Sequence, residues 1–291
     1  WDESERFAHF QRLSLPDSAF EELAAEATAN GLLFLSTPFD VEAVEFLDAL
    51  VPAFKIASGD LTFPPLLERV AEKKKPILLS TGMASLEEIQ AALETIRRAA
   101  KIERGELGGR VVLLHCVSSY PTAPEEANLL AVRRLSDEFG LPVGYSDHTL
   151  GILACIGAVA FGACVIEKHF TLQKEGRTFR DHQLSADVAE MTELVASLRT
   201  LTMMFGSGEK MPAPSEEANR ISMRRSLAAR TDIKAGDVIS AEQITCLRPG
   251  TRLPPSLLPE VIGHVALHDV PAGHLIPASA IFPERSAPDR G

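Results

Sequence analysis

Short, continuously apolar runs alternate with longer amphipathic segments along the first two thirds of the chain. The apolar runs have the length of buried strands, and the amphipathic segments have the length of helices of about three turns. Strands that are apolar throughout are typical of a parallel sheet with both faces covered. The pattern therefore predicts six parallel strands joined by helices, at 32–36, 54–58, 76–80, 110–116, 141–146 and 164–170.

The clearest helix is expected at 85–101, where Ser85 and Glu88 have the spacing of a capping box. Further helices are expected at 40–50, 63–73, 124–140, 150–162 and 187–206.

Each predicted strand ends in polar or reactive residues. Parallel strands of this kind can form an open doubly wound sheet or a (β/α)8 TIM-type barrel. An open sheet collects ligands at one switch point, whereas a barrel gathers all of its strand ends around one mouth, so the polar ends favour the α/β barrel. Because that fold has eight strands, we expect the first two to lie upstream of Trp1 and to be lacking in this chain. The polar ends are Ser36-Thr37, Ser58-Gly59-Asp60, Ser80-Thr81-Gly82, His115-Cys116, Ser146-Asp147-His148 and Glu167-Lys168-His169.

The pattern changes after the helix that is expected to close the barrel. Residues 1–206 are expected to form the barrel domain, and 207–225 have the polar, proline-bearing composition of a linker. From 226 to 285 short β-like runs are broken by turns, and "DIKAGDVI" and "DVPAGHLI" are near-repeats. This part predicts a small, separate, mostly β domain.

Composition narrows the classes of function. A net charge of −11 and a pI near 5.3 argue against a nucleic-acid groove or an anionic membrane surface, since both recruit basic patches. No apolar stretch is long enough to span a bilayer and no signal peptide is evident, so a cytoplasmic location is expected. The four cysteines form no CxxC pair, and three of them, Cys116, Cys155 and Cys164, lie in apolar runs and are expected to be reduced core thiols.

Two histidines, His148 and His169, end neighbouring predicted strands. A single histidine is more often a core or rim residue, but two at adjacent strand ends of a barrel can reach one point. They favour a shared divalent metal or a catalytic pair. Two imidazoles completed by water and substrate oxygens suit Mn²⁺, Fe²⁺ or Co²⁺ better than a structural zinc.

A lysine and several hydroxyls occupy the other strand ends. Lys55 lies within a predicted strand, where a buried ammonium is costly unless it meets an anion. Ser58, Ser80 and Ser146 offer hydroxyl donors, and a glycine follows Ser58 directly. A single serine is usually a turn or cap residue, but this combination predicts a phosphate or carboxylate site.

Six motifs occur in order along the chain: "FLSTPFD", "KIASGD", "LLSTGMASLEEI", "LLHCVSSYPT", "GYSDHTLG" and "VIEKHFTL". This series resembles that of the sialic acid (N-acetylneuraminate) synthase family, and the tail is similar to its antifreeze-like (SAF) domain. The resemblance implies a (β/α)8 barrel plus a SAF domain that is exchanged across a homodimer. It also implies condensation of phosphoenolpyruvate with an N-acyl hexosamine such as N-acetylmannosamine, giving a nine-carbon 2-keto acid and phosphate.

Residue roles carry over by motif. The resemblance implies that His148 and His169 bind a divalent metal, Mn²⁺ first, with Mg²⁺ or Co²⁺ as alternatives. It implies phosphoenolpyruvate contacts from Lys55, Ser58, Ser80 and Ser146, with Thr37 as a weaker candidate. The sugar-side and catalytic residues it implies are Asp60, Tyr120 and Asp181, and Arg248 of the SAF domain is expected to hold the N-acyl group in the partner subunit's site.

The chain departs from the family pattern in two places. Ser118 stands where relatives carry asparagine. The early glutamate–asparagine and lysine–glutamine motifs of the family are not found, so no general acid or base can be assigned. Two alternatives therefore stay open. One is a legionaminic or pseudaminic acid synthase, and the other is an inactive sugar-binding remnant.

Overall fold

The computed structural model describes residues 7–8, 11–177, 179 and 181–283. The chain divides into two compact units, Trp1–Gly206 and Ser207–Gly291. Residues 1–6, 9–10, 178 and 180 of the predicted barrel domain and 284–285 of the predicted SAF domain lie outside the described residues.

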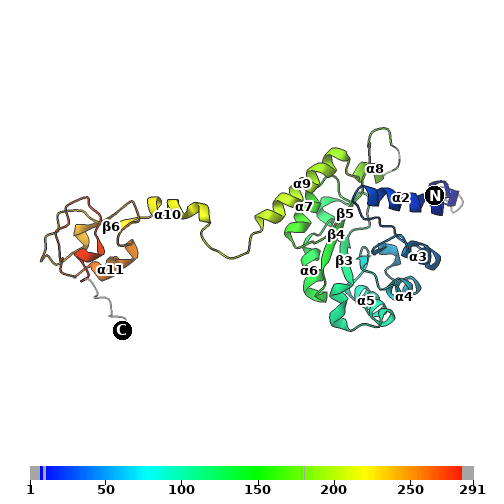
Figure 1. Ribbon diagram of the computed structural model, residues 1–291, viewed down its shortest axis with the longest axis horizontal. Coiled ribbons are helices and arrows are strands. Elements are labelled where there is room, and N and C mark those ends of the chain that lie inside the picture. Colours follow the sequence, from blue (N-terminus) through cyan, green and yellow to red (C-terminus); the bar gives the residue numbers. More distant parts are fainter. Residues whose placement is uncertain (1–6, 9–10, 178, 180, 284–291) are drawn as a thin grey trace. The chain divides into compact units, whose positions relative to one another are not determined.

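Within the described residues of the first unit, five strands form one parallel sheet. They are β1 (Phe54–Ile56), β2 (Ile77–Ser80), β3 (Val111–Cys116), β4 (Val143–Asp147) and β5 (Ile166–Lys168), and they pair in chain order. Helices connect each strand to the next: α4 (Pro64–Glu72), α5 (Leu86–Ala100), α6 (Leu130–Phe139) and α7 (Leu153–Ala160). Figure 1 shows these helices following one another around the strands. The α/β repeat predicted from the apolar runs is confirmed.

Strand alternation sends one set of side chains towards the helices. Phe54, Ile56, Leu79 and Leu113 are fully buried in that layer. Every second residue along these strands therefore lies on the other face, which is the face that a barrel would turn inward.

The sheet curls strongly. Lys55 of β1 and Glu167 of β5 stand on the two edge strands, yet Lys55 Nζ lies 3.4 Å from Glu167 Oε2. In a flat sheet these strands would be about 19 Å apart, because neighbouring strands are spaced by about 4.8 Å. Their side chains could not bridge that gap, so the sheet has the curvature of a barrel wall and not of an open sheet.

The strand predicted at 32–36 is wrong, because no strand is assigned there among the described residues. Leu32 and Leu33 are 64% and 79% exposed. A strand gains its stability from ladders with its neighbours, and this segment makes none with β1. The segment lies between α2 (Asp17–Ala29) and α3 (Val41–Asp48).

Local details of the first unit bear on the other predictions. The capping box at α5 is confirmed, because Ser85 Oγ accepts from the Glu88 amide and the Glu88 carboxylate accepts from the Ser85 amide.

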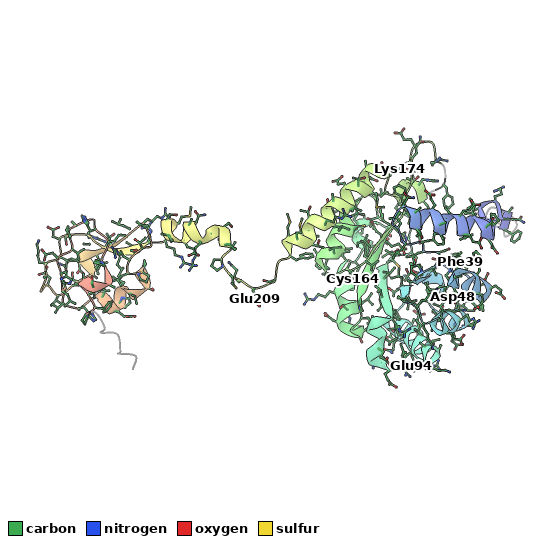
Figure 2. All side chains as sticks on the ribbon, viewed as in Figure 1. Phe39, Asp48, Glu94, Cys164, Lys174 and Glu209 are labelled. Carbon is green, nitrogen blue, oxygen red and sulfur yellow. The ribbon has the colours of Figure 1, made fainter. Side chains whose placement is uncertain are left out.

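Cys116 and Cys155 are buried, but Cys164 is exposed just before β5 (Figure 2), so its prediction as a core thiol is wrong. The first unit continues with α8 (Asp181–Leu184) and α9 (Val188–Met204) and also contains the 3₁₀ helices η1 (Ser58–Asp60), η2 (Arg104–Gly109) and η3 (Pro124–Glu126).

The second unit has its own apolar core and an antiparallel pair, β6 (Ser226–Ala229) and β7 (Ile244–Leu247). The stretch predicted as a linker contains η4 (Pro214–Glu216) and α10 (Glu217–Met223). Short helices η5 (Ala241–Gln243), η6 (Pro255–Leu257), α11 (Leu258–Val261) and η7 (Ala278–Ala280) follow.

The two near-repeats of the second unit bind each other symmetrically. Ile233 and Val270 exchange both backbone hydrogen bonds, at 3.0 and 2.8 Å. Asp269 Oδ1 accepts from the Ala235 amide at 2.9 Å, and Asp232 Oδ1 accepts from the Ala272 amide at 2.8 Å. The repeated sequence is thus repeated structure.

Among the residues that the structure describes, no helix combines the length and the apolar character that a bilayer crossing requires.

Candidate active site

Polar side chains gather on the face of the sheet that is turned away from the helices. Alternation from the buried residues of each strand puts a set of seven on this inner face. It contains a cation, a carboxylate, two hydroxyls, a thiol and two imidazoles, contributed by all five strands or their ends: Lys55, Ser80, Cys116, Ser146, His148, Glu167 and His169.

The two histidines lie side by side. Their ring centroids are 5.3 Å apart and the rings are inclined by 68°. His148 Nδ1 lies 2.7 Å from the Val117 carbonyl oxygen, so Nδ1 carries the proton and Nε2 is the nitrogen that can bind a cation. Burial lowers the pKa of His148, and the neighbouring His169 lowers it further, although the hydrogen bond to Val117 opposes the change. A neutral imidazole is the form that ligates metals.

The distance between the two imidazole rings can be compared with the distance expected for two rings that bind the same ion. A metal–nitrogen distance of about 2.1 Å puts each ring centroid about 3.2 Å from the ion, so two ligating rings have centroids about 4.5–5.6 Å apart. The observed separation of 5.3 Å falls in that range. Within the described part of the chain no three His, Cys, Asp or Glu side chains are grouped so as to hold one ion, so a metal here would need ligands from water or substrate.

Serine hydroxyls form a cradle around Gly82, beside β2 and β3. The Gly82 amide donates to Ser58 Oγ at 3.0 Å, and Ser58 Oγ is 3.2 Å from Cys116 Sγ. A Cβ atom on Gly82 would lie 2.5 Å from Ser118 Oγ and 2.8 Å from Ser58 Oγ. Glycine is thus required for this close approach of hydroxyls to backbone. The Ser118 hydroxyl is part of the same cradle.

A buried hydroxyl and an ion pair complete the polar face. Ser80 is 2% exposed, and its hydroxyl has no hydrogen-bond partner among the described residues. An unpartnered buried hydroxyl is costly, and a ligand that accepts from it would remove the cost. Ser146 Oγ donates to Glu167 Oε1 at 2.8 Å, and the other Glu167 oxygen faces Lys55.

The three predicted sugar-side residues come from three different segments that follow strands of the sheet. The Tyr120 ring lies 4.1 Å from the His148 ring and 6.0 Å from the His169 ring, measured between centroids. Asp60 ends η1, two residues after Ser58, and burial raises the pKa of its carboxyl. Asp181 begins α8, and the segment after this helix returns to the strand end, since the Ala186 amide donates to the His169 carbonyl at 2.7 Å.

Two predicted residues belong to other parts of the chain. Thr37 is half-buried and directly follows the segment 32–36, which forms no strand. Arg248 belongs to the second unit, where its Nε donates to the Met223 carbonyl at 2.8 Å.

Sequence reasoning did not assign Glu167 or Cys116 to the site, and it gave Gly82 only as part of a polar strand end. Glu167 precedes His169 by two residues, and residues two apart on a strand share a face. The same alternation assigns Cys116 to the inner face, because it lies three residues after Leu113, a buried residue of β3 that faces the helices. The cradle formed by Gly82 had no comparable signal, because it depends on Ser58 and Ser118 from other loops.

Fold and site together define an α/β-barrel-type protein with a serine cradle and an imidazole pair at the carboxyl ends of its strands. The sequence profile of the NeuB family matches residues 1–210, and that of the SAF domain matches residues 224–281. The chain belongs to the NeuB family.

Curated relatives and solved structures agree with this assignment. The N,N'-diacetyllegionaminic acid synthase of Legionella pneumophila is 41% identical over 94% of this chain and 76% of its own length. The pseudaminic acid synthase of Helicobacter pylori is 35% identical over 98% of this chain and 82% of its own length. The structure of N-acetylneuraminic acid synthetase from Leptospira borgpetersenii superimposes with a TM-score of 0.68 at 33% identity, covering 75% of this chain and 74% of that one.

Proposed function

We propose that this protein condenses phosphoenolpyruvate with an open-chain N-acyl hexosamine, giving a nine-carbon 2-keto sugar acid and inorganic phosphate. The observation that carries this proposal is the shared inner face: Lys55 and the serine cradle lie on the same face of the sheet as the two histidines. Such a face can hold an anionic substrate next to a polarised carbonyl group.

The proposed anion contacts act by position and charge. Lys55 and the hydroxyls of Ser58, Ser80 and Ser146 bind the phosphate and carboxylate of phosphoenolpyruvate, and the Gly82 amide orients Ser58. Phosphoenolpyruvate displaces Glu167 from Lys55 when it binds, because both anions need the same ammonium group.

The sugar is proposed to bind over the histidines. His148 and His169 would hold a divalent cation, with Mn²⁺ preferred over Mg²⁺ or Co²⁺, and the chemistry it would supply is polarisation of the sugar aldehyde. Tyr120, Asp60 and Asp181 orient the sugar, and Arg248 of a partner subunit is proposed to bind its N-acyl group. C3 of phosphoenolpyruvate then forms a bond to the aldehyde carbon, water adds to C2, and the tetrahedral intermediate loses phosphate by cleavage of the C2–O bond.

Two sugars are candidates. N-acetylmannosamine would give N-acetylneuraminate, and a 2,4-diacetamido-trideoxy hexose would give legionaminic acid. The chain is 41% identical to a legionaminic acid synthase and 35% identical to a pseudaminic acid synthase, which favours the legionaminic acid precursor over the pseudaminic acid precursor. Exchange of the SAF domain within a homodimer and a cytoplasmic location stay predictions from the resemblance.

Phosphate release and product mass test the proposal. The purified chain with Mn²⁺, phosphoenolpyruvate and either sugar should release one phosphate per molecule of sugar acid, and a labelled bridging oxygen of phosphoenolpyruvate should leave with the phosphate. A chelator should stop the reaction, and Mn²⁺ should restore it. His148→Ala and His169→Ala should lower kcat/KM by about a hundredfold or more, whereas the exposed His268→Ala should not. Binding of sugar without phosphate release under all of these conditions would instead favour a sugar-binding remnant.

A further inference from the structure

A buried ion pair lies directly behind the two histidines. In the ladder between β4 and β5, Asp147 is paired with Lys168, the residues that precede His148 and His169. Lys168 Nζ donates to Asp147 Oδ2 at 2.7 Å, and the two side chains are 2% and 0% exposed. Because residues alternate along a strand, this pair faces the helices while the histidines face the site.

The pair is the centre of a closed hydrogen-bond network. Asp147 Oδ1 accepts from the Tyr145 hydroxyl at 3.1 Å and from the Thr149 amide at 2.9 Å. Its other oxygen also accepts from Cys155 Sγ of α7 at 3.3 Å. Lys168 Nζ makes a second bond, to the Thr149 carbonyl at 2.6 Å.

The network holds the backbone on both sides of His148. Asp147 precedes this histidine and Thr149 follows it, and both are bound by Lys168, which itself precedes His169. The imidazole of His148 is further tied to the Val117 carbonyl at the end of β3. Three strand ends are thereby joined around the two rings.

A requirement for stability does not by itself explain such a pair. Burying two charges costs desolvation energy, and apolar replacements of similar size are often as stable or more so. What charged groups add is direction, since each donor and acceptor must keep its geometry.

We propose that Asp147 and Lys168 are positioning residues that fix the two imidazoles at the separation needed for a shared divalent cation. This inference rests on the proposed metal site for its purpose, but the ordering of the imidazoles can be measured without metal. Residues that orient metal ligands from behind typically change metal affinity by about 10–100-fold when they are replaced.

The test uses the double variant Asp147→Leu/Lys168→Met of the full chain. Single substitutions leave one buried charge without its partner, whereas the double variant removes both and keeps the apolar layer filled. The matched control is Lys73→Met, which removes an ammonium that is paired with Glu45 at 2.8 Å on the helical surface. Thermal unfolding is recorded for all proteins.

Two readouts are combined. In metal-free protein with labelled histidine, nitrogen NMR at one pH should show His148 as a single tautomer with its proton on Nδ1, and the double variant should show tautomer averaging at His148. The dissociation constant for Mn²⁺, followed by the electron paramagnetic resonance of free Mn²⁺, should rise by about 10–100-fold in the double variant and stay unchanged in the control.

Unchanged histidine spectra in a folded double variant would overturn the inference, whatever its metal affinity. If the wild-type chain bound no Mn²⁺ at the histidines, the proposed metal site would fall, while the spectra would still decide whether the pair positions the rings.

Discussion

Lys55 and Glu167 come from the first and last strands of the sheet and meet across its inner face at 3.4 Å. Their contact places a cation and a carboxylate at the centre of the candidate site. The ammonium group of Lys55 is thus paired with an internal carboxylate.

This pair leads to opposite predictions for its two members. Lys55→Met should raise the KM for phosphoenolpyruvate by about 10–100-fold, since a charge-assisted contact contributes about 1.5–3 kcal/mol. Glu167→Gln should lower that KM, because it removes an anion that competes for Lys55. Steady-state kinetics at saturating sugar measure both values, and an increase in KM for Glu167→Gln would contradict the competition.

Gly82 and Gly59 form a matched pair for testing the cradle. A Cβ on Gly82 would lie 2.5 Å from Ser118 Oγ, whereas a Cβ on Gly59 would meet nothing within 4 Å. Gly82→Ala should displace the serine hydroxyls and raise the KM for phosphoenolpyruvate by about tenfold or more, as overpacking costs about 1–3 kcal/mol. Gly59→Ala should leave KM near the wild-type value. Equal effects of the two substitutions would show that the cradle does not bind the anion.

Asp60 is expected to lower stability at neutral pH. Burial raises the pKa of its folded-state carboxyl, so the charged form is disfavoured by folding above that pKa and the cost disappears below the unfolded value of about 4. Asp60→Asn should therefore be more stable than wild type at pH about 7, by less than about 1 kcal/mol because solvent screens this half-buried group. The gain should vanish as the pH falls below about 4.

Asp48 provides a control of opposite sign. Burial would raise the pKa of this α3 carboxyl, but hydrogen bonds from Lys75 and Lys73 lower it overall. Figure 2 labels Asp48 among the helices of the first unit. Asp48→Asn should lose stability at neutral pH, and the loss should fade as the pH falls through the folded pKa. Denaturant unfolding from neutral pH to below about 4 measures the free energy of unfolding of Asp60→Asn and Asp48→Asn relative to wild type. If both differences changed in the same direction with pH, the opposite pKa shifts of the two carboxyls would be contradicted.

Gly144 tests the packing of the site-bearing strands. A Cβ here would lie 2.6 Å from both the Val165 carbonyl oxygen and Leu114 Cδ2. Gly144→Ala should lower the free energy of unfolding by about 1–3 kcal/mol, because backbone and core must both shift. Gly109→Ala, where nothing lies within 4 Å, should change it by less than about 0.5 kcal/mol. Thermal unfolding of the two variants gives the comparison.

Local pattern was sufficient for much of this protein. The apolar runs around Ile56, Leu79 and Leu113 predicted buried parallel strands, and alternation at β5 puts Glu167 on the same face as His169. Capping at Ser85 was also determined locally, since both partners lie within one helical turn. These features depend on neighbours in the sequence, and the sequence lists those neighbours directly.

Features that join distant segments required the folded structure. Nothing local indicated that Lys55 would face Glu167, that Ser118 and Ser58 would close on Gly82, or that Asp147 and Lys168 would form a buried pair behind the histidines. The strand expected at 32–36 failed for the same reason, because its apolar composition could not supply a paired neighbour. Strand pairing and sheet curvature are set by contacts across the whole sheet, so they were decided only when the chain was folded.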